Sequence, residues 1–220
     1  MFVNLYIPSE YEELKRIPGG GLTLIRGEPE SYYYLVGRYI LFNHCMNGGR
    51  TLYIALDENI EDIRESMATL GMNINVFEAN RQWVFMDLYS KRIESFTEKE
   101  LLKYVQNGFW TALDSLSTFL LEFIQVENTI SFIKHLSSIF RLSNGLHIAY
   151  VIPSLHDVRI NVLLKQAADI VMDCSYSEEG GTISRLLKII KIKRRPFHGI
   201  MIPFIITSYG ISFEITTRLA

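Results

Sequence analysis

The sequence predicts an α/β protein in which helices flank a mostly parallel, twisted sheet, with an antiparallel extension made by the last strands. From residue 22 onward, short strand-like runs alternate with helix-like stretches, the pattern that builds a parallel sheet with crossover helices. After residue 170 the strand-like runs follow one another too closely for helical crossovers, so they should pair largely antiparallel. We expect a single domain over residues 1–220, because this length supports one sizeable core.

The first half of the chain is expected to supply a strand, a helix, a second strand and a second helix. Residues 22–25 predict a short buried strand, and residues 31–45 predict a helix with Ser31 as its N-cap. Residues 51–56 predict the next strand, because they are almost wholly apolar. Apolar side chains then recur at helical spacing as far as Gly71, which indicates a helix packed on the sheet.

The middle of the chain predicts two more strands and two helices. Apolar runs at residues 83–88 and 109–113 have the length of strands, and a helix that begins near Thr97 separates them. Residues 126–142 form a long amphipathic stretch that a Ser-Asn-Gly turn ends. Its expected buried face carries Ile130, Ile133, Leu136, Ile139 and Phe140.

The last part of the chain predicts a strand at residues 146–152, a short helix at residues 158–166, and then only strands. These later segments lie at Ile170 and at residues 183–192, 202–206 and 211–215. The uncharged run over residues 196–213 has nearly the length of a membrane-spanning helix, but its Pro and Gly residues indicate two strands joined by a turn. We therefore expect no membrane association.

Composition excludes several classes of protein. The 22 Lys and Arg nearly balance the 24 Asp and Glu, which argues against a disordered chain and against a surface that binds nucleic acid as a whole. Two cysteines without CxxC spacing cannot form a disulfide framework, so we expect a reducing compartment and no metal site. The N-terminus lacks the pattern of a secretory signal, and the expected location is the cytoplasm.

The most informative segment is the turn between the first strand and the first helix, where a phosphate-binding loop would lie in an α/β protein. It consists of Gly27, Glu28, Pro29, Glu30, Ser31, Tyr32, Tyr33 and Tyr34. Here the chain resembles the RecA-superfamily ATPases, specifically the single-domain KaiC-like and archaeal RadA-paralogue branch, whose loop has the sequence G-E-P-G-S-G-K-T-T. The resemblance implies a RecA-like, P-loop NTPase type of fold over most of the chain.

The residues that would bind phosphate in that family are replaced. Glu30 and Tyr32 stand where the family has glycine, Tyr33 where it has lysine, and Tyr34 where it has threonine. A tyrosine supplies no positive charge, and its side chain hinders the approach of backbone amides to a phosphate. An acid at the start of the helix would also repel phosphate. The hypothesis is that acid and tyrosine rings occupy the phosphate pocket. The alternative is an ordinary aromatic first turn of a buried helix.

Three carboxylates are expected near this turn. Asp57 and Glu58 follow the second strand, and Asp114 follows the strand predicted at residues 109–113. The resemblance implies that Glu58 or Asp57 matches the water-activating carboxylate of the family and that Asp114 matches the residue that normally holds magnesium. Taken alone, Asp114 is better interpreted as the N-cap of the next helix. We expect relics without metal, because such a cluster is costly unless it is hydrated, bound to a cation or partly protonated.

A basic cluster lies near the C-terminus and comprises Lys188, Lys191, Lys193, Arg194 and Arg195. In the KaiC-like family a Lys-x-Arg pair near this point reaches toward the γ-phosphate of a neighbouring subunit, and Lys191 with Lys193 resembles that pair. The resemblance thus implies contact with a neighbouring subunit, and local DNA binding is a second possibility. The alternative is a solvated edge strand that its positive charges protect from aggregation.

Together these features predict a non-hydrolysing paralogue that regulates or supports active RecA-family ATPases, with recombination and repair as its setting. We expect no cofactor, with ATP and Mg²⁺ absent or weakly bound, and a RecA-family paralogue or a second copy of the chain as partner. The alternatives are slow, unconventional ATP hydrolysis that uses Glu58 and Asp114, a nucleotide-independent DNA-binding module, and a regulatory subunit of the archaellum motor. Ser154, His156 and Asp157 only superficially resemble a hydrolase trio, since they share one loop and no GxSxG motif exists.

Overall fold

A nine-stranded sheet runs through the computed structural model, which describes residues 2–7, 11–90, 98–179, 181–207 and 209–214. The strand order is β11-β10-β9-β8-β3-β7-β6-β4-β5. Strands from β8 to β5 in this order are parallel, and β9, β10 and β11 are added antiparallel. The strands are β3 (Leu22–Arg26), β4 (Thr51–Ala55), β5 (Trp83–Asp87), β6 (Trp110–Asp114), β7 (His147–Val151), β8 (Ile170–Glu179), β9 (Thr182–Ile192), β10 (Ile200–Thr207) and β11 (Gly210–Phe213). The predicted α/β architecture with antiparallel C-terminal strands is confirmed.

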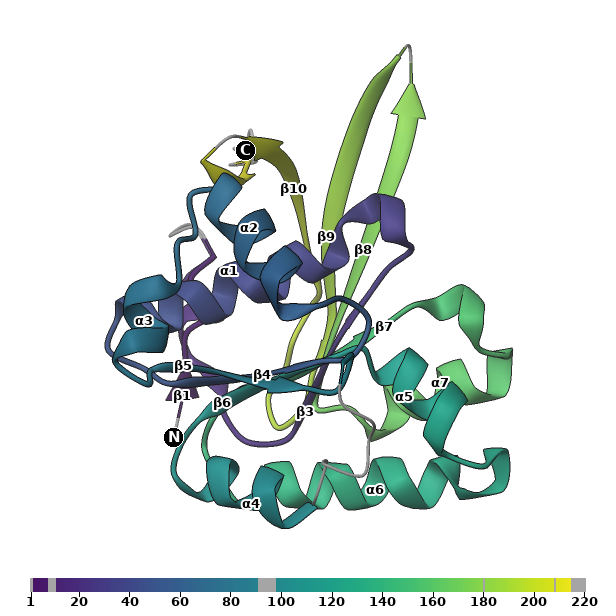
Figure 1. Cartoon of the computed structure of the whole chain (residues 1–220). Coiled ribbons are helices and arrows are strands. Elements are labelled where there is room, and N and C mark those ends of the chain that lie inside the picture. Colours follow the sequence, from purple (N-terminus) through teal and green to yellow (C-terminus); the bar gives the residue numbers. More distant parts are fainter. Residues whose placement is uncertain (1, 8–10, 91–97, 180, 208, 215–220) are drawn as a thin grey trace.

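Helices cover both faces of the sheet and form two separate apolar cores (Figure 1). The helices on one face are α1 (Tyr33–Met46), α2 (Ile60–Thr69) and α3 (Asn75–Ala79). Those on the other face are α4 (Glu98–Gln106), α5 (Leu116–Phe123), α6 (Thr129–Phe140) and α7 (Val158–Ala167). The central strands β3, β4, β6 and β7 are buried along their whole length and are largely apolar, because each of them is covered from both sides. No helix among the described residues is long and apolar enough to cross a membrane.

Several elements differ from the sequence-based expectations. The helix expected at residues 126–142 begins at Thr129, after a 3₁₀ turn at Val126–Asn128, and Ile130 is exposed rather than buried. Ile130 lies in the first turn of α6, beside the gap that separates α6 from α7. Helices α3 and α5 and a small antiparallel pair, β1 (Phe2–Val3) with β2 (Ile17–Pro18), were not predicted. Thr97 and residue 215, at the expected ends of two elements, lie outside the described residues.

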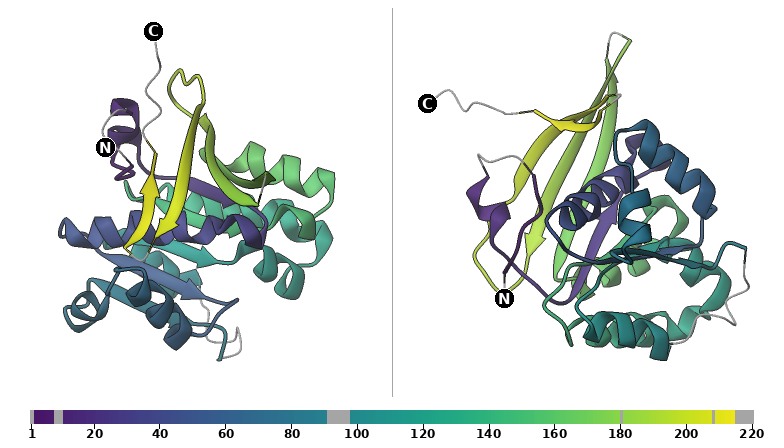
Figure 2. Two further views of the ribbon diagram at one scale, coloured as in Figure 1. Left: turned by 90° about the horizontal axis from the view of Figure 1, so that it is seen from above. Right: turned by 60° about the vertical axis from the view of Figure 1, so that its left-hand side comes forward.

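The antiparallel extension projects from the body of the molecule. Strands β8 and β9 form a long hairpin that rises past the helices, and β10 with β11 continues the sheet beside α1 (Figures 1 and 2). Because β9 pairs with β8 on one side and β10 on the other, it is an interior strand. The interpretation of the basic segment as a solvated edge strand is therefore wrong.

The carboxyl ends of the parallel strands meet along one edge of the sheet. Arg26 of β3, Ala55 of β4 and Asp114 of β6 end their strands there, and Ala55 pairs directly with Asp114. The β3–α1 turn begins at Gly27, and the β4–α2 turn carries Asp57 and Glu58, so both turns emphasised in the sequence analysis lie at this edge. This edge is where α/β folds place their ligands.

Candidate functional site

The β3–α1 turn is closed by hydrogen bonds within the chain. The amide of Gly27 donates to Val151 O at 3.1 Å, and those of Ser31 and Tyr32 donate to Glu28 O at 2.9 Å and Pro29 O at 3.0 Å. The segment Pro29–Ser31 thereby forms a 3₁₀ turn in front of the helix. These three N–H groups are thus engaged by carbonyls of the protein itself and do not converge on an external anion.

The start of α1 differs from the prediction that Ser31 is its N-cap. Tyr32 precedes the helix in a left-handed conformation, with φ of 53° and no side-chain capping bond. The Ser31 hydroxyl instead donates back to Glu28 O at 2.7 Å, since the 3₁₀ turn places the two groups together. Gly27 permits this tight curl, because a Cβ at that position would come within 2.8 Å of Tyr33 Cβ and 3.0 Å of Cys174 O.

The sequence predicts acid at the N-terminal end of the first helix, but neither Glu28 nor Glu30 lies in the first turn of α1. The Glu28 carboxylate accepts hydrogen bonds from the backbone amide of Ser154 at 3.1 Å and from its hydroxyl at 2.6 Å. Glu28 therefore ties the turn to the segment that follows β7. Glu30 is exposed, because the 3₁₀ turn directs its side chain to solvent.

The three tyrosines have three different environments. Tyr33 is buried, and its ring packs edge-on against the ring of Tyr150, with 6.0 Å between the two ring centres. Tyr34 is half-buried and lies against the guanidinium of Arg38, with 4.7 Å between its ring centre and the Arg38 carbon Cζ. Tyr32 is exposed. The interior position next to the sheet edge is thus taken by two rings, not three.

Arg38 connects the acids that the sequence analysis singled out. Its Nη2 donates to Glu58 Oε2 at 2.6 Å and to Asp114 Oδ2 at 3.1 Å, while its Nε donates to Tyr53 Oη at 3.0 Å. The Tyr53 hydroxyl in turn donates to Asp114 Oδ2. Arg38 is only 1% exposed, so this is a buried ion cluster with its cation supplied by α1. Asp57, in contrast, is exposed, and its carboxylate makes no hydrogen bond to the cluster among the residues that the structure describes.

The ionisation of these groups is set by their burial and by the charges and hydrogen bonds of their neighbours. Burial raises the pKa of Asp114, while the charge of Arg38 and the hydrogen bond from Tyr53 act in the opposite direction. Burial opposes the charge of Arg38, yet Tyr53, Asp114 and Glu58 hold its pKa well above the ordinary value. Burial also raises the pKa of Tyr33, and the nearby charges of Asp114 and Asp57 raise it further, so its phenol stays neutral.

Sequence reasoning missed Arg38, although a signal was present. It is the sole Lys, Arg, Asp or Glu in the helix Tyr33–Met46, which is otherwise largely apolar. A lone charge in such a helix requires a partner when the helix packs on a sheet. The alternative that Asp114 caps the next helix is wrong, because Ser115 is the N-cap of α5 and accepts from the Thr118 amide at 3.2 Å.

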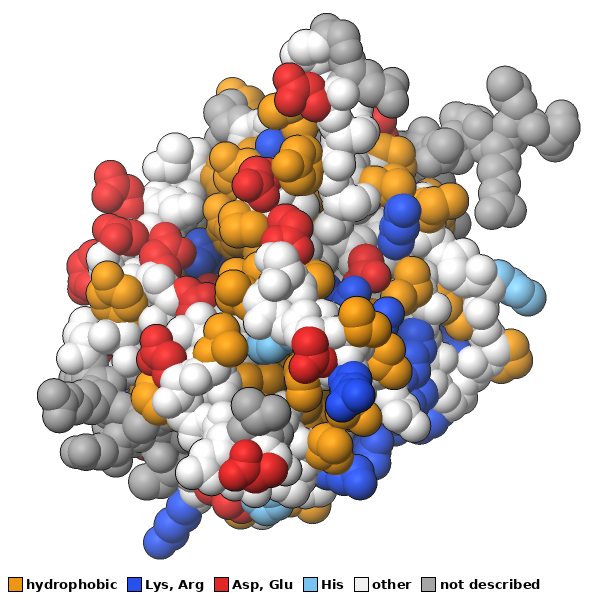
Figure 3. Space-filling view, turned by 90° about the vertical axis from the view of Figure 1, so that its right-hand side faces the viewer, with side chains coloured by type: hydrophobic (Ala, Val, Ile, Leu, Met, Phe, Trp, Pro, Cys, Tyr) orange, Lys and Arg blue, Asp and Glu red, His pale blue; other side chains and the backbone are white. Residues whose placement is uncertain are grey.

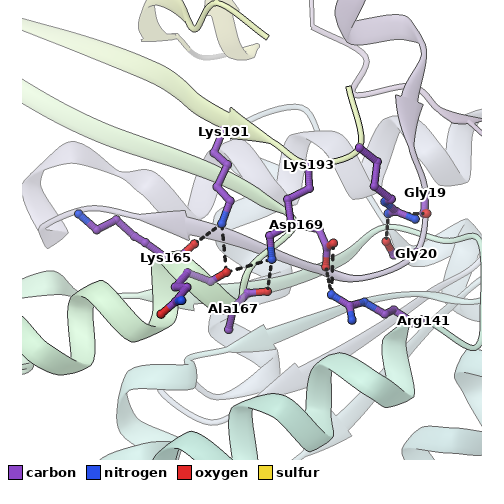
Figure 4. A network of polar contacts seen from close by, with 10 residues as sticks. Gly19, Gly20, Arg141, Lys165, Ala167, Asp169, Lys191 and Lys193 are labelled. Atoms are coloured by element: carbon purple, nitrogen blue, oxygen red, sulfur yellow. Dashed lines mark hydrogen bonds and ion pairs between the residues drawn. The ribbon is translucent and has the colours of Figure 1, made fainter. Parts of the chain in front are cut away.

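The basic cluster is bonded within the chain. Lys191 donates to the carbonyls of Lys165 and Gln166, and Lys193 to those of Gln166 and Ala167, all at the C-terminal end of α7 (Figure 4). Arg194 donates to Gly19 O and Gly20 O, and Arg195 to Glu13 O and Arg16 O. Lys188 pairs in register with Asp173 across β9 and β8. These contacts account for the cluster structurally, and its contact with a neighbouring subunit or DNA stays a prediction.

The residues that resemble a hydrolase trio do not assemble into one. Ser154 bonds Glu28, and Asp157 caps α7 by accepting from the Ile160 amide at 2.9 Å. His156 Nε2 lies 2.9 Å from Ser117 Oγ, not from Ser154. Over the described ranges, no group of three or more His, Cys, Asp or Glu side chains is arranged to hold a metal ion.

Comparison with known proteins gives the family. The sequence profile described as "ATPase: KaiC" matches residues 8–137, more than half of the chain. The chain belongs to the KaiC ATPase family. Asp114 ends β6, and the Asp57–Glu58 pair follows β4, the strand that pairs with β6.

Two solved structures share the fold over 98% of this chain. The flagellar accessory protein FlaH from Methanocaldococcus jannaschii superposes with a TM-score of 0.79 at 16% identity, covering 98% of this chain and 100% of that one. The KaiC-like protein PH0186 from Pyrococcus horikoshii OT3 superposes with a TM-score of 0.79 at 19% identity, covering 98% and 99%. A UPF0273 protein from Thermotoga maritima is 28% identical over 89 residues, which span 40% of this chain and 36% of that protein.

Proposed function

We propose that this KaiC-family chain neither binds nor hydrolyses ATP at the β3–α1 turn and that it acts as a regulatory or scaffolding partner of active RecA-family ATPases. The observation that carries the proposal is the buried ion cluster in which Arg38 bonds both Glu58 and Asp114. In an ATPase of this family those carboxylates would serve water and magnesium. Here a cation fixed to α1 is already paired with both of them.

Mg-ATP does not fit the residues that are present. The position of the phosphate-binding lysine holds the neutral, buried ring of Tyr33, and the amides of Ser31 and Tyr32 are bonded to loop carbonyls. Binding a triphosphate would require breaking those bonds and moving the ring out of the apolar core beside Tyr150. The nucleotide would gain no lysine in exchange.

Calorimetric titration with Mg-ATP, together with thermal melting, tests the proposal. We expect no saturable heat and no change in the melting temperature of the natural chain at millimolar Mg-ATP. A rise of several degrees would overturn the proposal, because a ligand that binds the folded state stabilises it by mass action.

Two variants show which residues prevent nucleotide binding. The first variant restores the family's loop through Glu30→Gly, Tyr32→Gly, Tyr33→Lys and Tyr34→Thr, and the second adds Arg38→Ala. We expect nucleotide binding to return more strongly in the second variant, because Glu58 and Asp114 are then released for magnesium. Equal binding by both variants would show that the ion cluster is not the obstacle.

The partner ATPase is proposed to act in one of two settings. Recombination and repair is the setting first expected from the sequence, and a motility setting is supported by the whole-chain likeness to a flagellar accessory protein, which at 16% identity is a likeness of fold. Co-purification of the tagged chain with the RecA-family ATPases of its own cell separates the two settings. A strand-exchange ATPase or a motor ATPase would be retained on the tagged chain, and the chain alone would be inactive.

A further inference from the structure

A groove separates α6 from α7 on the face of the sheet opposite α1. It has a volume of about 550 Å³ and lies away from the β3–α1 turn. Apolar side chains from both helices form its walls, namely Ile130 and Ile133 from α6 and Leu163 and Ala167 from α7. Ile130 is 41% exposed there, although the amphipathic pattern of α6 directs it toward the core.

Three cations surround this apolar groove. Lys134, Arg141 and Lys193 line it, and only Arg141 pairs with a described carboxylate, that of Asp169 at 3.3 Å. Figure 4 shows Arg141 paired with Asp169, whereas the Lys193 ammonium is bonded to the carbonyls of Gln166 and Ala167. Figure 3 shows the side of the molecule that lies on the right in Figure 1, and Lys and Arg side chains gather at its lower right, next to apolar ones. One acid among three cations leaves the groove positively charged.

A buried polar group in the groove also lacks a partner. Ser137 lines the groove and is 5% exposed, yet its hydroxyl has no hydrogen-bond partner among the described residues. A buried hydroxyl without a partner is costly, so an unused donor and acceptor at this position favours a ligand with a polar side chain.

We propose that this groove binds an acidic, amphipathic helix of a partner protein. The lining residues Ile130, Lys134, Ser137 and Arg141 repeat at the spacing of one face of α6 over roughly three turns, the length of a short docked helix. The partner's apolar side chains would insert between Ile130 and Leu163. Its carboxylates, two turns apart, would pair with Lys134 and Arg141.

Helix binding in the α6–α7 groove does not depend on whether nucleotide binds at the β3–α1 turn, because the groove shares no lining residue with that turn. The groove supplies a surface for the regulatory or scaffolding role and would bind the helix even if ATP bound elsewhere. A peptide is favoured over nucleic acid because the groove walls are aliphatic. No described aromatic side chain that could stack on a base lines it.

Fluorescence anisotropy with a synthetic peptide tests the proposal. The probe is a labelled helix of about 14 residues, roughly four turns, with Leu on one face and two Glu residues two turns apart. Its twin carries Lys in place of Glu. We expect the full chain to bind the acidic peptide in the micromolar range and the basic twin at least about tenfold more weakly.

Matched variants assign the binding to the groove. Lys134→Glu and Ile130→Gln should each weaken binding by about tenfold, while Lys103→Glu, the same charge reversal on the exposed face of α4, should not change it. All three side chains are exposed, so unchanged melting temperatures will confirm folding. Equal binding of both peptides, no binding of the acidic one, or insensitivity to Lys134→Glu would overturn the proposal. So would an oligonucleotide that binds through Lys134 where the acidic peptide does not.

Discussion

Arg38 Nη2 lies 3.1 Å from Asp114 Oδ2, and both side chains are buried between α1 and the sheet. The two residues are 76 positions apart in the sequence and meet because α1 packs on the face of the sheet over β4 and β6. The same guanidinium holds Glu58, so one residue joins the ends of β4 and β6 to α1. The stability of the chain should therefore depend on this pair.

Removal of Arg38 should be strongly destabilising. The Arg38→Met variant leaves the Asp114 charge buried without its cation, for which we expect a loss of roughly 3–5 kcal/mol in the free energy of unfolding. The double variant with Asp114→Asn should recover part of that loss, because the buried charge is gone and Tyr53 can still donate to the amide oxygen. Urea unfolding measures both.

A surface ion pair serves as the control for this prediction. Arg64 pairs with Glu61 and Glu78 at a more exposed position on α2, so Arg64→Met should cost only about 0–1 kcal/mol. A similar cost for the Arg64 and Arg38 variants would show that the Arg38 cluster is an ordinary surface network.

Helix α1 also depends on close packing at Gly37. A Cβ added there would come within 2.7 Å of ring atoms of the buried Tyr150. Gly37→Ala should therefore destabilise by roughly 1–3 kcal/mol, even though alanine is the better helix former by about 1 kcal/mol. Thermal melting checks this, with Gly37→Ala in a Tyr150→Leu background as the control. The penalty should shrink there, because the ring that Cβ meets is gone, and an undiminished penalty would refute the packing argument.

The sheet could be predicted largely because its central strands are short, mostly apolar runs. The pattern predicts a strand at residues 109–113, and the structure has it one residue later, at Trp110–Asp114. Helix α5 (Leu116–Phe123) was missed, since it follows β6 after a single residue and its apolar side chains run on from the strand.

The polar contacts of the site could be predicted much less well. The Arg38–Asp114 pair joins distant segments, and a sequence does not show which carboxylate a lone buried arginine will meet. The partners of Lys191 and Lys193 are backbone carbonyls of α7, which every residue has and which leave no mark in the sequence. The positive charges could be seen in advance, but not their role in the fold.

Acid should weaken the fold through two histidines that are held neutral. Burial lowers the pKa of His147 to about 3 and that of His44 to about 4, from about 6.5 in the unfolded chain. Between about pH 6.5 and pH 4 the unfolded state therefore binds more protons than the folded state. The free energy of unfolding should therefore decrease as the pH is lowered through this window, by up to about 1.4 kcal/mol per pH unit for each histidine.

Replacement of one histidine separates its contribution to this pH dependence. His147 contacts the hydroxyls of Thr111 and Ser143, so His147→Gln keeps polar contacts while removing the titration. Urea unfolding across the pH window should show a shallower slope for the variant than for the natural chain. An identical slope would mean that His147 binds its proton equally readily in the folded and unfolded states, so that burial does not lower its pKa.

The C-terminal end of α7 should depend on Lys193. Its ammonium donates to Gln166 O at 2.9 Å and to Ala167 O at 3.1 Å, carbonyls that the helix itself leaves unpaired. Lys193→Met should cost roughly 1–2 kcal/mol and should speed hydrogen exchange in the last turn of α7. Lys165→Met, the same charge change on α7, is the control. If contact with a neighbouring subunit is instead the role of Lys193, the variant will keep its stability but lower the ATPase rate of an active KaiC-family partner. That result would contradict the capping role, because the loss would then lie in the partner's reaction and not in this fold.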